Sequence, residues 1–96
     1  MKMEAMQKMI DICIEYTQDK FDIIQFQHEL EKIFLPDECK QTLEIDQHNA
    51  HNRLEGIRFS YIVDNLKLHS REVAKELIIE ALIEQKRLSS YLPYAQ

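Results

Sequence analysis

Glycine and proline are scarce in this 96-residue chain, which contains one Gly and two Pro. Sandwiches and barrels need glycine-rich turns at short intervals, and neither an Asn-Gly nor an Asp-Gly hairpin signal occurs. The scarcity excludes these β architectures and leaves an all-α fold. The length suits one helical domain covering residues 1–96.

Cysteine and long apolar runs are also lacking. Cys13 and Cys39 each stand alone, so the chain has neither a zinc-type pair nor a disulfide framework. We expect free buried thiols, with a cross-link between the two as the open alternative. Charged residues interrupt every apolar stretch, as Glu80 does between Leu77 and Ile83, so we expect a cytoplasmic protein without a signal peptide or membrane span.

Large apolar side chains are abundant: the sequence holds 12 Ile, 10 Leu, 2 Val and 4 Phe. Each contributes about 1.5–3 kcal/mol when fully buried, which is enough for the chain to fold without a metal or a disulfide. Their spacing predicts helices.

The first predicted helix covers about residues 2–18. Its buried stripe is Met6, Met9, Ile10, Cys13 and Thr17. Asp22 has the position of an N-cap, with Gln25 at the capping-box position, for a second helix that ends at Leu35-Pro36. Its buried stripe is predicted to be Ile23, Phe26, Leu30, Ile33 and Phe34.

Pro36 fits the first position of a short extra helix, where its missing N–H costs nothing. Residues 46–52 are poor helix formers, so we expect a break or distorted turn there. A central helix then covers about residues 50–67, in which Gly56 indicates the close approach of a neighbouring helix. It is apolar on two sides, with Ala50, Leu54, Ile57 and Tyr61 on one and Phe59, Ile62, Val63 and Leu66 on the other.

Ser70 is predicted to cap the last helix, and residues 91–96 are expected to be irregular. The core stripe of this helix is predicted to be Ala74, Leu77, Ile78, Ala81, Leu82 and Leu88. Short connections after Asp19 and Leu68 make neighbouring helices antiparallel. We therefore predict an antiparallel four-helix bundle around Met9, Ile10, Phe26, Leu30, Leu54, Ile57, Leu77, Ile78 and Ala81.

Motifs for catalysis and cofactor binding are missing. There is no glycine-rich phosphate loop, nucleophile elbow or metalloprotease motif. Asp46, His48 and His51 are the best metal candidate, but a cluster of polar residues explains their spacing more simply, since a fourth ligand is lacking. We predict a protein that is not an enzyme and that needs no cofactor or metal.

Charge is unevenly distributed along the chain, whose formal net charge is −5. Residues 1–46 carry 11 acids and 5 bases, whereas residues 47–96 carry 6 acids and 7 bases. The bases of the second half are interleaved with acids and show no recognition-helix pattern, so we expect no nucleic-acid binding.

Two acidic stretches are candidate partner-binding surfaces. Within residues 37–46, the first consists of Asp37, Glu38, Glu44 and Asp46. The alternative without a binding function is that Asp37 and Glu38 complement a helix dipole, while Glu44 and Asp46 are solvated.

The second acidic stretch lies in the last helix, where Glu72, Glu76, Glu80 and Glu84 follow one another at four-residue spacing. Ile79 and Ile83 project near Glu72 and Glu76. They are either covered by the tail or a neighbouring helix, or they anchor a basic partner or a second copy of the chain. The candidate binding residues here are Glu72, Glu76, Ile79, Glu80 and Ile83.

Three stretches resemble a known family: Met9-Ile-Asp-Ile-Cys-Ile-Glu-Tyr, Lys20-Phe-Asp-Ile-Ile-Gln-Phe and Glu29-Leu-Glu-Lys-Ile-Phe34. They are similar to the opening helical hairpin of small bacterial immunity proteins of the colicin D type. The resemblance covers residues 9–34. It implies a non-catalytic inhibitor that covers the basic cleft of a cognate nuclease toxin with an acidic surface.

Two hypotheses follow for the function. The first is a bacterial immunity protein that binds a basic toxin or nuclease domain and performs no chemistry. The alternative is a self-associating helical adaptor or regulatory module, in which Ile79, Ile83 and the tail tyrosines pair with a second copy, forming a homodimer, or with a different protein.

Overall fold

The computed structural model describes residues 2–60 and 63–91, and the regular structure within these ranges is helical. Its elements are α1 (Lys2–Thr17), α2 (Ile23–Glu31), the 3₁₀ helix η1 (Asp37–Cys39), α3 (Leu43–Ser60) and α4 (Val63–Tyr91). None of the described helices is both long and apolar enough to cross a membrane.

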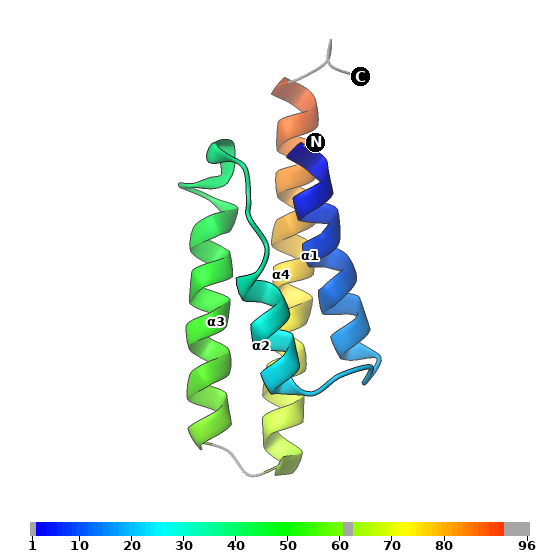
Figure 1. Ribbon diagram of the computed structural model, residues 1–96, viewed down its shortest axis with the longest axis vertical. Helices are drawn as coiled ribbons and strands as arrows, with labels where there is room; N and C mark the ends of the chain where they lie inside the picture. The colour runs from blue at the N-terminus through cyan, green and yellow to red at the C-terminus, as the bar shows by residue number, and fades with distance from the viewer. Residues whose placement is uncertain (1, 61–62, 92–96) are drawn as a thin grey trace.

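The four α-helices run alternately down and up, so that neighbours are antiparallel (Figure 1). α4 packs between α1 and α3, while α2 closes the bundle by contacting those two helices. The predicted all-α antiparallel bundle is therefore confirmed. The short extra helix after Pro36 is η1, with Pro36 as its N-cap instead of its first residue.

The core follows the predicted stripes closely. Of the nine core residues expected, Ile78 is partly buried and eight are buried: Met9, Ile10, Phe26, Leu30, Leu54, Ile57, Leu77 and Ala81. Tyr16 stacks on Phe26 with ring centroids 4.3 Å apart, which joins α1 to α2. Cys13 and Cys39 are buried free thiols, as expected.

Asp19 ends α1 in a Schellman turn. Its φ is 62°, in the left-handed region that Asp tolerates better than most residues. The Lys20 amide donates to the Glu15 carbonyl at 3.1 Å, and the Asp19 amide donates to the Tyr16 carbonyl at 3.0 Å. The chain thereby reverses into α2, whose N-cap is Asp22, as predicted: its side chain accepts from the Gln25 amide at 2.8 Å.

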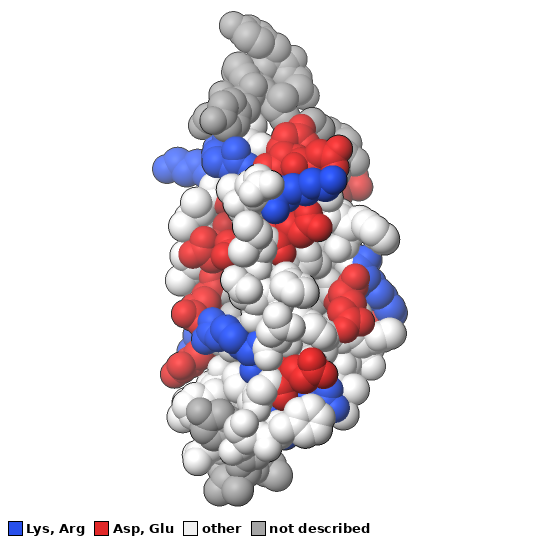
Figure 2. All heavy atoms as spheres, turned by 90° about the vertical axis from the view of Figure 1, so that its left-hand side faces the viewer, with Lys and Arg blue, Asp and Glu red and all other residues white. Residues whose placement is uncertain are grey.

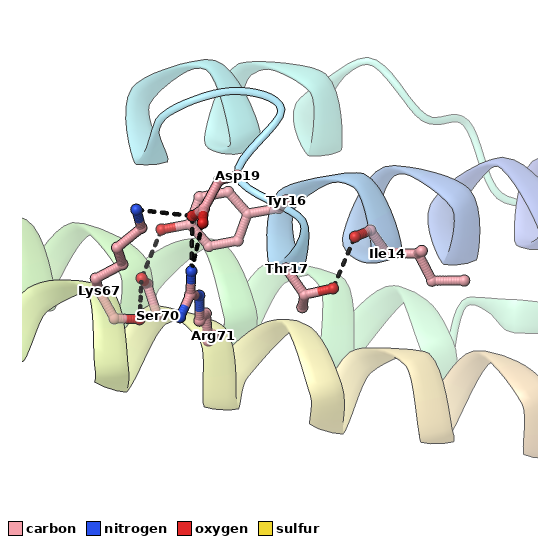
Figure 3. Close-up of polar contacts among 7 residues, drawn as sticks. All are labelled: Ile14, Tyr16, Thr17, Asp19, Lys67, Ser70 and Arg71. Carbon is pink, nitrogen blue, oxygen red and sulfur yellow. Dashed lines mark hydrogen bonds and ion pairs between the residues drawn. The ribbon is translucent and has the colours of Figure 1, made fainter.

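α4 holds this turn in place through polar contacts (Figure 3). The Asp19 carboxylate lies 2.7 Å from both Lys67 and Arg71. Hydrogen bonds from these two cations lower the pKa of Asp19. Beneath them the hydroxyls of Tyr16 and Ser70 are hydrogen-bonded at 2.5 Å, which fixes α1 against α4.

Ser70 lies inside α4, so the prediction that it caps the last helix is wrong. It is fully buried and donates to the Lys67 carbonyl at 3.1 Å. The helix predicted for residues 50–67 also does not exist as such: α3 ends at Ser60 and α4 begins at Val63, with residues 61 and 62 outside the described ranges.

The break expected within residues 46–52 is likewise wrong, because α3 is continuous from Leu43 to Ser60. Its buried residues, Leu43, Ala50, Leu54 and Ile57, form one helical stripe. Packing of this stripe stabilises the helix, and burial outweighs the weak propensity of the polar residues between.

Three further predictions about single side chains are wrong. Phe34 is 91% exposed because α2 ends at Glu31, so residue 34 no longer follows the period of the helix. Leu82 is 51% exposed, since Ala74, Leu77, Ala81 and Leu88 already form the buried stripe of α4. Gly56 marks no close approach: a Cβ there would meet nothing within 4 Å.

Candidate protein-binding surface

The fold separates Glu44 from Asp46, which face opposite sides of α3. Asp37 and Glu44 line a cleft of about 580 Å³ between α2, the segment around η1, and α3. Asp46 instead lines a groove of about 270 Å³ between α3 and α4. Asp37 and Glu44 therefore lie on a different surface from Asp46, and Glu38 is not among the residues that line either the cleft or the groove.

The α3–α4 groove brings Asp46 together with Glu76 and Glu80 of the last helix. Its remaining lining residues are Asn49, Ala50, Arg53, Val73 and Leu77. Arg53 is the only base in this lining, and its guanidinium lies 2.6 Å from the Glu76 carboxylate. The groove thus has three carboxylates and one cation.

Asp46 stands out electrostatically in this groove. Burial raises the pKa of its carboxyl group, and the negative charge of Glu84 raises it further. Ionisation of Asp46 in the isolated chain is therefore less favourable than ionisation of an aspartate carboxyl group in water. A cation placed in the groove would stabilise the ionised form.

Ile79 and Ile83, both from α4, are 55% and 56% exposed. Glu72, on the same helix, lines a separate hollow with Arg53 and His69. Viewed from the α3 side, acidic atoms form several patches, some of which follow one another along one edge, and basic and uncharged atoms lie beside them (Figure 2). On this face, acidic sites therefore lie beside apolar and basic ones.

Glu84 is buried in a network of polar contacts, unlike Glu72, Glu76 and Glu80 of the same helix, which are exposed. It is 4% exposed and 2.6 Å from the Nε of Arg87, and the Thr42 hydroxyl donates to it. Arg87 also donates to the Glu38 carbonyl at 2.9 Å, which ties η1 to the end of α4. Hydrogen bonding to Arg87 lowers the pKa of Glu84 to about 2, against the opposing effect of burial.

The thiol of Cys39 lies beside this network. Burial raises its pKa to about 12, and the neighbouring Glu84 carboxylate acts in the same direction. Glu84, Arg87 and Thr42 therefore hold the start of α3 against α4. This arrangement was not foreseen, because the four-residue spacing of the α4 acids shows neither the burial of Glu84 nor its contacts with Arg87 and Thr42.

The α2–α3 cleft contains a feature that periodicity did not identify, the exposed ring of Phe34. His48 and His51 line the same cleft, and Nε2 of His51 lies 3.2 Å from a Glu31 oxygen. Asp46 lies on the other side of α3, so the metal candidate considered above does not assemble. Over residues 2–60 and 63–91, no three His, Cys, Asp or Glu side chains are grouped to hold a metal.

Comparison with known proteins identified no relative of this chain. No protein-family model, no curated protein and no solved structure matches the chain. Inference about function therefore depends on the residues and the geometry described above.

Proposed function

We propose that this chain is a non-catalytic inhibitor of the immunity-protein type, which binds a basic site on a cognate bacterial toxin in the cytoplasm. The observation that carries the proposal is the α3–α4 groove, where Asp46, Glu76 and Glu80 surround a single arginine. Asp46 comes from one acidic stretch of the sequence, and the two glutamates come from the other.

A basic side chain of the partner would be stabilised in this groove by charge. The negative charge of Asp46 is less favourable in the free chain than in water, and a lysine or arginine beside it removes that disadvantage. Arg53 neutralises only Glu76 within the lining, so Glu80 is a second carboxylate for such a cation. Complementary fields also accelerate encounter, and salt screens this effect.

Inhibition is tested with the toxin candidate encoded directly beside this chain's gene. Co-expression of the chain is expected to restore growth of cells that produce the toxin, and the two purified proteins should form a stoichiometric complex. A neighbouring protein that is not toxic, or a toxin that neither binds nor is neutralised, refutes the proposal.

Charge reversal then locates the contact. Asp46→Lys and Glu80→Lys are expected to slow association by tenfold or more at low salt, and the loss should shrink as salt rises. Glu55→Lys is the matched control, because Glu55 is an exposed acid of α3 outside the groove lining. If Glu44→Lys alone weakens binding, the contact lies in the α2–α3 cleft and the assignment to the groove is wrong.

A further inference from the structure

The outward face of α4 carries a regular stripe opposite its buried residues. Leu68, Ile79 and Leu82 are 58%, 55% and 51% exposed, although all three are large apolar side chains. Exposed charged residues complete the stripe, which reads Leu68, Glu72, Lys75, Ile79, Leu82 and Lys86. Successive members are alternately four and three residues apart, which is the spacing of a helix-pairing seam.

Half-exposed apolar residues at this spacing indicate a second helix as the partner. None of Ile79, Leu82 and Lys86 lines the α3–α4 groove, so the stripe is a different surface from the toxin-binding site proposed above. Its charges are ordered along the helix: Glu72 lies seven residues before Ile79, and Lys86 lies seven residues after it.

We propose that two copies of this chain pair through the outward faces of α4, antiparallel, with the two-fold axis at Ile79. In this register residue 79 meets residue 79 of the second copy, and Glu72 meets Lys86 of the second copy. Two complementary ion pairs then lie at the ends of the contact, Ile79 of both copies lies at its centre, and Lys75 of each copy lies between them beside Leu82 and Ile83 of the other. In a parallel pairing, Glu72, Lys75 and Lys86 would each face the same residue of the second copy. Repulsion between these like charges disfavours the parallel arrangement.

The size of the contact makes the dimer weak. The paired stretch is symmetric about residue 79 and runs from Glu72 to Lys86, which are 14 residues apart, so a rise of about 1.5 Å per residue gives a contact about 21 Å long. One helix per copy over this length buries less than the roughly 800 Å² per partner of a stable interface. We therefore expect a weak dimer that dissociates to the monomer in dilute solution.

Sedimentation equilibrium of the full chain, from about 10 µM to 1 mM, tests the pairing. The average mass should rise toward that of a dimer, and Ile79→Glu should weaken dimerisation tenfold or more because it brings two carboxylates together at the axis. Ile24→Glu is the matched control, since Ile24 is 56% exposed on α2 and should leave dimerisation unchanged. A monomer throughout the range, or equal loss in both variants, overturns the proposal.

The direction of pairing is tested by charge exchange. Glu72→Lys should weaken the dimer, and adding Lys86→Glu should restore it, because the ion pair forms again with reversed signs. Far-ultraviolet circular dichroism checks that each variant keeps the helical fold. Failure of the double variant to recover excludes the antiparallel register. The neutralisation assay with the toxin is independent of this outcome, since dimerisation concerns a different face of α4.

Discussion

Glu84→Gln is expected to remove a pH-dependent part of the stability of the bundle. Glu84 is 4% exposed, and its hydrogen bond with Arg87 keeps its pKa at about 2 in the folded chain, against an ordinary value of 4.5. At about 1.4 kcal/mol per pKa unit, this difference corresponds to about 3 kcal/mol of folding free energy. Glutamine keeps an acceptor for the Thr42 hydroxyl but loses the negative charge.

The direction of the pH dependence follows from the lowered pKa. A carboxyl group whose pKa is lower in the folded state stabilises the fold above its unfolded pKa. That contribution is lost as pH falls from about 4.5 through about 2. The variant should therefore be less stable than the wild type by about 3 kcal/mol at pH 7, and the difference should approach zero near pH 2.

Urea unfolding followed by circular dichroism at 222 nm measures this difference at a series of pH values. All other carboxyl groups titrate in both proteins, so subtracting the two stability curves leaves the contribution of Glu84 together with its effect on Asp46. Glu80→Gln, an exposed position on the same helix, serves as the control and should change stability by less than about 0.5 kcal/mol. A difference between variant and wild type that is the same at pH 7 and pH 2 would refute the reasoning.

Three further outcomes are expected. Gly56→Ala should raise stability by about 0.5–1 kcal/mol in urea unfolding, because the position is in the interior of α3 and a Cβ meets nothing within 4 Å; an unchanged or lower midpoint contradicts this. Cys13 and Cys39 should react slowly with a thiol reagent in the native protein, since burial raises both pKa values to about 12, and the melting temperature should be the same with and without reductant. Tyr16→Phe should lower the free energy of unfolding in urea by about 1 kcal/mol, because it removes the buried hydrogen bond to the Ser70 hydroxyl. Phe21 is an aromatic residue without such a bond, so a substitution there serves as the control.

Local features of the sequence were enough to predict the fold class. Periodic apolar residues predicted the buried stripe of α1, and Asp22 predicted the start of α2, because stripes and caps depend on residues only a few positions apart. The scarcity of glycine and proline excluded the competing β architectures in the same way. The buried thiols were also expected, since Cys13 shares its stripe with Met6 and Met9.

Helix boundaries were decided by tertiary packing. The polar residues 46–52 have weak helix propensity, yet α3 continues through them because Ala50 and Leu54 are buried in the core. Ser70 has the residue type of an N-cap, but its hydroxyl is buried against Tyr16 of α1. A partner 54 positions away in the chain cannot be recognised from local pattern.

The candidate site illustrates the same division between sequence and structure. Charge counting along the chain identified both acidic stretches, because it needs only composition. The sequence could not show that Glu44 and Asp46 face different surfaces, that Asp46 and Glu80 line the same groove, or that Glu84 is buried beside Arg87. These relations depend on how α3 packs against α4, and that packing is set by the burial of apolar side chains from all four helices at once.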